Sequence, residues 1–281
     1  MEFKRDNLFF AIEHYQACAM LFRAATLTAV HEMYSGHPVR KCLVEYLYKR
    51  VSSGFSNAMA IGTHSMEASS DIGSINRGAF EAAVNFLFVT GDQTNGRIAA
   101  FWLFAAQEEI KRNNQVAEWK TCADPIIKKL ALREYQDLGS EEDHKKTILP
   151  SLGVQEEDLK RWPSLEQRTK VIGDMWAYLY DSHYRALSTW QHGDTSRLIV
   201  TDTFVETLGG YPDRTDYETF VMVSWAFDIL ANFCISITNL EPQRHAQALI
   251  RENYASITTL VASLTKDHQQ RMRHVAEKLS N

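Results

Sequence analysis

Glycine and proline, the residues that most often interrupt helices, are scarce in this sequence: its 281 residues include 13 glycines and 6 prolines. Most of them fall between apolar runs of helical period rather than inside them. Only residues 196–204, SRLIVTDTF, have the β-branched composition of a strand, and one short strand cannot form a sheet. We therefore expect an all-α fold, a multi-helix bundle. The expected helices are 6–34, 38–61, 65–90, 95–119, 124–149, 155–161, 164–192, 216–240 and 242–279.

Paired cysteines and an excess of basic residues are also missing. The four cysteines are widely spaced and form no CxxC pair, which argues against zinc ribbons and disulfide scaffolds. The formal charge of −5 excludes a broad basic surface of the kind that coats DNA or membranes. Any site for an anionic ligand must therefore be local and made by a few arginines and lysines. Because residues 1–16 lack a secretory signal pattern, we expect reduced thiols and a cytoplasmic protein.

Neither a membrane span nor a metal site is expected. The most apolar window, residues 220–240, contains Ser224, Asp228 and Asn232, so a buried core helix is the better interpretation. A di-iron site needs two Glu-x-x-His elements, but the sequence offers one, Glu141 to His144, among charged neighbours. We interpret it as a solvated helix face, and we expect no metal and no other cofactor.

The familiar catalytic signatures are absent: there is no glycine-rich phosphate loop, no GxSxG and no HExxH. Within residues 69–89, however, four polar residues fall on one narrow stripe of an otherwise apolar helix. These residues are Ser74, Arg77, Glu81 and Asn85. Two interpretations remain open. Arg77 and Glu81 form an ion pair at the rim of the bundle, or the stripe is a polar seam inside the bundle or at a dimer contact.

A second polar line runs along the expected helix 164–192. It consists of Tyr178, Asp181, Arg185, Ser188 and His192. The opposite face is expected to form the core, with Ile172, Met175, Trp176, Leu179, Ala186, Leu187 and Trp190. A solvated helix face would explain this pattern, but the line lacks the lysine, glutamate and glutamine that usually fill such a face. His183 lies on the apolar side and is expected to be a satisfied core histidine.

The polar line has the groups that phosphodiester chemistry requires. Arginine presents a planar fork of donors to phosphate oxygens, and histidine transfers protons near neutral pH. Arg185 and His192 are therefore the candidate catalytic residues. Asp181 is positioned to orient the Arg185 guanidinium, and Ser188 to donate a hydrogen bond to a phosphate oxygen.

The spacing Arg185-x6-His192 resembles the Arg-x4–6-His motif of the HEPN superfamily of helical nucleotide-binding domains. Many HEPN proteins are metal-independent endoribonucleases of toxin and phage-defence systems, in which two copies form a composite cleft. The resemblance implies attack by a ribose 2′-hydroxyl, with Arg185 stabilising the transition state and His192 acting as acid or base. It also implies RNA as substrate, a homodimer, and a cognate antitoxin or defence partner.

Three segments, 75–88, 161–174 and 180–194, are similar to an uncharacterised family of bacterial all-helical proteins. That likeness covers about residues 65–240 and suggests that Arg77, Glu81, Arg185, Ser188 and His192 form one constellation. The implied organisation is an N-terminal helical region (1–64) packed on a HEPN-like core (65–240), followed by a C-terminal helix (241–281).

Two further functions fit the same residues. In a non-catalytic helical interaction protein, Arg185 would pair with Glu81 or Asp181, and His192 would cap a helix. In a nucleotide-sensing module, the same polar pocket would bind its ligand without cleaving it.

Overall fold

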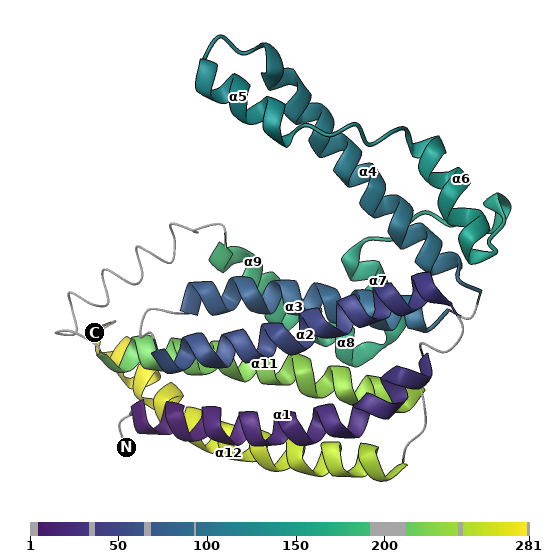
Figure 1. Cartoon of the computed structure of the whole chain (residues 1–281). Helices are drawn as coiled ribbons and strands as arrows, with labels where there is room; N and C mark the ends of the chain where they lie inside the picture. Colours follow the sequence, from purple (N-terminus) through teal and green to yellow (C-terminus); the bar gives the residue numbers. More distant parts are fainter. Residues whose placement is uncertain are drawn as a thin grey trace.

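Helices form all the regular secondary structure of the described residues, which are 5–33, 37–64, 69–92, 94–191, 212–240 and 244–279. In this computed structural model, five long helices lie alongside one another (Figure 1). They are α1 (Arg5–Met33), α2 (Pro38–His64), α3 (Ser69–Thr90), α11 (Pro212–Leu240) and α12 (Arg244–Leu279). The predicted all-α multi-helix bundle is confirmed. One hydrophobic core runs from Leu8 to Ile257, so the three predicted regions share it.

Helix α11 lies at the centre of the bundle, where it packs against α1, α2, α3 and α12. The Phe227 ring stacks on Tyr15 at 4.6 Å between centroids, and Phe233 meets Phe86 edge to face at 4.9 Å. By length and composition, Glu218–Asn239 is the one candidate membrane span among the described residues, and 72% of its most apolar window is buried inside the protein. This burial fits the predicted core helix.

Glycines set the close approach of α2 to its neighbours. A Cβ atom built at Gly54 would lie 2.8 Å from the Cβ of Ala79 on α3. A Cβ at Gly62 would lie 2.8 Å from a methyl group of Val223 on α11. Real Cβ atoms are not found this close to other carbons, so any larger residue at either position would push the helices apart.

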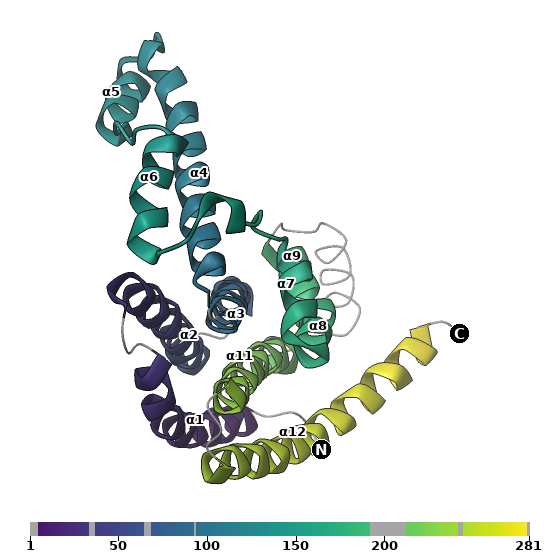
Figure 2. The same cartoon turned by 90° about the vertical axis from the view of Figure 1, so that its right-hand side faces the viewer.

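Three helices form an arm that projects from the bundle (Figures 1 and 2): α4 (Gly96–Glu118), α5 (Pro125–Glu134) and α6 (Glu141–Leu152). The prediction of one helix over 124–149 is wrong. The chain leaves α5 after Glu134, and α6 starts afresh with a capping box between Ser140 and Asp143. Gly139, with φ of +70°, makes the turn before this cap.

The predicted helix 164–192 is also interrupted. It consists of α7 (Leu165–Ile172), α8 (Asp174–Leu179), a π-helical turn (Tyr180–Tyr184) and α9 (Arg185–Gln191). Gly173 separates α7 from α8 with φ of +141°, a conformation that residues with a side chain rarely adopt.

Other predicted boundaries differ by smaller amounts. The predicted helix 155–161 is a single 3-10 turn, Glu156–Asp158, and α11 begins at Pro212 rather than at residue 216. Proline is favoured at the first position of a helix, which accounts for the earlier start of α11. Residues 192–211, which include His192 and the strand-like segment 196–204, lie outside the described residues.

Candidate functional site: a polar seam between helices α3 and α9

The polar stripe of α3 meets the segment that contains the π-helical turn and α9. Arg77 Nε lies 3.3 Å from Glu81 Oε1, and the two side chains are 26% and 43% exposed. The same Glu81 oxygen accepts a 2.6 Å hydrogen bond from the Tyr184 hydroxyl, and Arg77 Nη1 donates to Ser188 Oγ at 3.5 Å. The two interpretations of the stripe are therefore parts of one network. Arg77 and Glu81 form the ion pair, and the same two residues also bind the segment of the π-helical turn and α9. We call this contact the seam.

Tyr184 joins the two sides of this seam, although it is not among the predicted site residues. The Arg77 guanidinium lies over its ring, with 5.1 Å between Cζ and the ring centroid. Burial, with help from the Glu81 carboxylate, raises the pKa of Tyr184 to about 12, so its hydroxyl stays a donor at neutral pH. One feature of the sequence hints at this role of Tyr184. It lies four residues before Ser188, and residues four apart share a helix face.

Arg77 keeps its charge within the seam. Burial on its own would lower the pKa of this guanidinium, but Tyr184 and Glu81 outweigh that effect, and the pKa is raised. Arg77 is therefore a fixed cation at the boundary between α3 and α9.

A second arginine, Arg168 of α7, extends the seam and was also missed. It is only 9% exposed, donates to Asn85 Oδ1 on the α3 stripe, and lies over the Trp162 ring at 4.7 Å. Burial lowers the pKa of Arg168 to about 10, an effect that Glu81 and Tyr184 partly offset. Of the polar stripe on α3, Arg77, Glu81 and Asn85 thus each have a partner on the α7–α9 segment.

Arg185 lies on the outer side of α9. Its Nε is 3.0 Å from Asp181 Oδ1, as predicted for a carboxylate that orients the guanidinium. A second carboxylate, Glu166 of α7, is 3.9 Å away, and the Arg185 side chain is 59% exposed. Of the two partners predicted for Arg185, Asp181 rather than Glu81 forms the ion pair. Ser188 lies one turn after Arg185 on α9 and contacts Arg77.

The structure therefore brings the predicted site residues together in two adjoining groups. Arg77, Glu81 and Ser188 belong to the seam, whereas Asp181 and Arg185 form the outer cluster. The remaining predicted residue, His192, lies outside the described residues.

The predicted core face of this segment is confirmed in part. Trp176, Leu179 and Leu187 are buried, and Tyr178 on the polar line is 62% exposed. Ile172 and Ala186 are half-buried, and the Trp190 side chain lies outside the described part of the structure. Met175 is 50% exposed, against the prediction. The break at Gly173 leaves α8 as a short helix of its own, so its faces do not follow the register of α7.

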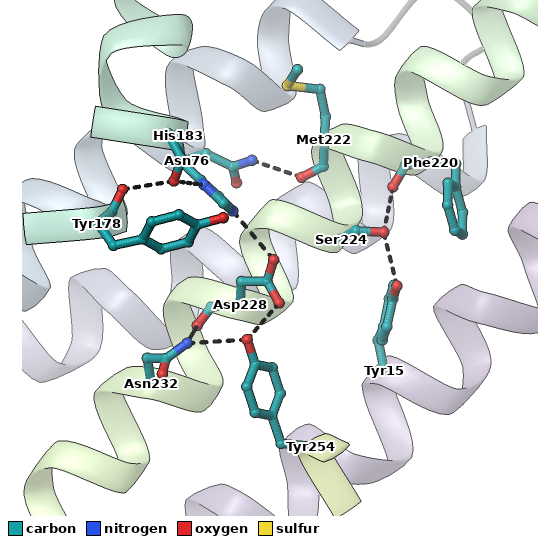
Figure 3. Close-up of polar contacts among 11 residues, drawn as sticks. Tyr15, Asn76, Tyr178, His183, Phe220, Met222, Ser224, Asp228, Asn232 and Tyr254 are labelled. Carbon is teal, nitrogen blue, oxygen red and sulfur yellow. Dashed lines mark hydrogen bonds and ion pairs between the residues drawn. The ribbon is translucent and has the colours of Figure 1, made fainter. Parts of the chain in front are cut away.

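Behind the seam, the π-helical turn is anchored to the core (Figure 3). His183 is 8% exposed, and its Nε2 lies 3.2 Å from Asp228 Oδ2 on α11. Asp228 also accepts a 3.0 Å hydrogen bond from the Tyr254 hydroxyl on α12, and His183 Nδ1 lies 2.7 Å from Ser182 Oγ. The prediction of a satisfied core histidine is confirmed. These contacts fix the turn that places Tyr184 against α3.

The single Glu-x-x-His element of the sequence is engaged in local contacts. His144 Nε2 lies 2.9 Å from the Leu138 carbonyl oxygen, and Glu141 lies 3.9 Å from the Lys145 ammonium. Within the part of the chain that the structure describes, no group of three or more His, Cys, Asp or Glu side chains is arranged to hold a metal ion.

Comparisons with known proteins give one finding. A search of curated proteins and a search of solved structures return no significant match. A family profile, described as a family of unknown function (DUF5677), matches residues 44–204. This match spans more than half of the chain and includes every residue of the seam and of the outer cluster. The chain therefore belongs to DUF5677, a family of unknown function.

Proposed function

We propose that this protein is a metal-independent endoribonuclease, an RNA-directed toxin or phage-defence effector that binds a phosphodiester on the α3–α9 face. One observation supports the proposal most directly: Ser188 contacts Arg77 and lies one turn after Arg185. A guanidinium group on α3 thus contacts a hydroxyl on α9, and a second guanidinium side chain, Arg185, starts one turn before that hydroxyl on the same helix. Guanidinium forks and hydroxyl donors are the groups that bind phosphate oxygens best.

The proposed reaction assigns each group a step. The ribose 2′-hydroxyl attacks the adjacent phosphorus, and the bond from phosphorus to the 5′-oxygen breaks. This leaves a 2′,3′-cyclic phosphate and a free 5′-hydroxyl. Arg185, oriented by Asp181, stabilises the charge that builds on the phosphate oxygens, and Arg77 and Ser188 support it.

His192 follows directly after α9 and is assigned the proton transfers on the basis of the HEPN resemblance alone. The same resemblance supports a homodimer with a composite cleft and a cognate antitoxin or defence partner in the cytoplasm.

A different observation favours the non-catalytic alternatives. Each of the two arginines already has a carboxylate partner, Glu81 for Arg77 and Asp181 for Arg185. Such pairs satisfy the guanidinium groups without any ligand, as in an interaction protein whose polar seam only holds helices together. A nucleotide sensor would use the same groups to bind without cleavage, and its ligand would raise the stability of the fold by RT ln(1 + [L]/Kd).

The decisive experiment is cleavage of end-labelled transfer and messenger RNA in EDTA by the parent protein and three variants. The variants are His192→Ala, Arg185→Ala and, as a control, Arg133→Ala, an exposed arginine on the arm that pairs with Glu134. We expect the parent and the control to leave 2′,3′-cyclic phosphate ends. Loss of His192 should reduce the rate by about 10²–10⁴-fold, the usual contribution of a general acid or base.

Folding and dimerisation of each variant are checked by circular dichroism and gel filtration. Arg185 is largely exposed, so its loss should leave the fold intact. No cleavage by a folded, dimeric parent, or full cleavage by His192→Ala, would contradict the ribonuclease. Stabilisation of the parent by nucleotides without any product would favour the sensor.

A further inference from the structure

A surface depression of about 450 Å³ lies between α2 and α3, next to the seam. Its lining residues are Arg50, Ser53, Gly54, Asn57, Ser74, Ile75, Gly78 and Ala79. The small residues Gly54 and Ala79 form its floor, where the two helices approach closely. None of the lining residues is acidic, and the polar groups are hydroxyls, one amide and one guanidinium. This lining suits an anion.

Arg50 differs from the arginines of the seam and the outer cluster. Among the described residues, the one hydrogen-bond and ring partner of its guanidinium is Tyr46, with 3.4 Å from Nη1 to the hydroxyl and 6.0 Å from Cζ to the ring centroid. It forms no ion pair there with a carboxylate, whereas Arg77 and Arg185 each do. Its Nη2 lies 3.3 Å from the position that a Cβ of Gly78 would occupy, so the guanidinium rests on the surface of α3. The charge of Arg50 therefore has no competing carboxylate partner among these residues.

The depression continues into the seam through α3. Ser74 lines the depression and belongs to the same polar stripe as Arg77, one turn away. On the other side, Tyr46, Arg50, Ser53 and Asn57 are spaced by four, three and four residues and form one exposed stripe of α2. A polar surface thus crosses from α2 over α3 to Ser188 on α9.

We propose that the depression is a phosphate subsite for single-stranded RNA, with a backbone phosphate on Arg50 and an unpaired base on Tyr46. Tyr46 is 53% exposed and lies one turn from Arg50. An exposed aromatic ring beside a guanidinium suits a single strand, because the bases of a duplex are stacked on one another and cannot reach the ring. The strand would continue over Gly78 to Arg77 in the seam. The choice of RNA as the ligand rests on the proposed function, whereas the phosphate subsite rests on the lining residues.

The test measures binding without cleavage. A fluorescent 2′-O-methyl oligoribonucleotide of about twelve nucleotides, within the usual site sizes, lacks the attacking hydroxyl. Its Kd is measured by anisotropy over a range of salt concentrations for the parent, Arg50→Gln, Tyr46→Ala and a control, Arg133→Gln. Arg133 is an exposed arginine on α5. Helix α5 lies at the outer end of the arm, away from α2 and α3 (Figure 1). Circular dichroism verifies that all four proteins are folded.

We expect Arg50→Gln to weaken binding by about tenfold and to reduce the salt dependence by about 0.7 in log–log slope, the value for one phosphate contact on a single strand. Tyr46→Ala should weaken binding at every salt concentration without changing the slope, and Arg133→Gln should bind like the parent. A duplex of the same length should compete poorly. Failure of the parent to bind, or unchanged affinity and slope in Arg50→Gln, would overturn the subsite.

The two proposals fail separately. A parent that binds the analogue through Arg50 but cleaves no RNA would support the subsite and contradict the ribonuclease. Cleavage of RNA with an unchanged KM in Arg50→Gln would support the ribonuclease and contradict the subsite.

Discussion

Two glycines inside helices, Gly54 on α2 and Gly78 on α3, should respond in opposite ways to replacement by alanine. In a helix interior, alanine is more favourable than glycine by about 1 kcal/mol. At Gly78, a new Cβ would meet only the far end of Arg50, at 3.3 Å, and this flexible side chain can move away. At Gly54, the new Cβ would lie 2.8 Å from the Cβ of Ala79, so α2 and α3 would have to separate.

The magnitudes follow from these contacts. Gly78→Ala should retain the helical gain and stabilise the protein by up to about 1 kcal/mol. Overpacking of a core contact costs about 1–3 kcal/mol, so Gly54→Ala should destabilise by up to about 2 kcal/mol after the same gain is deducted. The two variants should therefore differ by about 1–3 kcal/mol, the overpacking cost. At about 2–4 °C per kcal/mol for chains of this size, their melting temperatures should be easily distinguished.

Urea unfolding followed by far-UV circular dichroism measures both variants against the parent. The transition midpoint should rise for Gly78→Ala and fall for Gly54→Ala, with the same slope in all three proteins. If Gly54→Ala were as stable as Gly78→Ala, the close packing of α2 on α3 described above would be refuted. The floor of the proposed subsite would then be wrong as well.

Two other predictions concern the seam and the core. Tyr184→Phe removes the hydrogen bond to Glu81 and should cost about 1 kcal/mol at neutral pH. Because folding raises the pKa of Tyr184 from 10.0 to about 12, the parent should lose this contribution as pH rises through that interval, and Tyr184→Phe should show a flatter alkaline decline in its urea midpoints. Burial likewise raises the pKa of the Cys234 thiol to about 12, so an alkylating reagent should modify exposed Cys42 in the folded protein and Cys234 only after unfolding. Peptide mass mapping checks this order, and early modification of Cys234 would contradict the central position of α11.

The sequence predicts the long helices well, because their apolar period is sustained over many turns and the chain has few breakers. The split between α5 and α6 was missed although its signals are present. Gly139 favours a turn, and Ser140 is a favourable residue for the start of a helix. The surrounding residues are strong helix formers, however, and they favour the prediction of one continuous helix.

The site was predicted in part for the same reason. The stripe on α3 follows from a regular helical period, and its residues meet partners as expected. The π-helical turn depends instead on contacts between distant segments, such as His183 with Asp228 and Tyr184 with Glu81. No local pattern indicates these partners. The spacing from Tyr184 to Ser188 places both residues on one helix face, but it does not point to Glu81, and nothing near Arg168 points to Asn85. The role of His192 stays a prediction.

The arm leaves the bundle and returns to it at nearly the same point. Asn95, just before α4, donates from Nδ2 to the carbonyl oxygen of Leu152 at the end of α6, at 3.3 Å. Residues 96–152 are therefore one long insertion in the bundle, and its two ends lie next to each other. Closure entropy grows only with the logarithm of loop length, by about 0.6 kcal/mol for each doubling. Lengthening or trimming the outer end of the arm, around α5, would therefore change the stability of the bundle little, because the arm residues that join the hydrophobic core, such as Ile98 and Leu149, lie on α4 and α6.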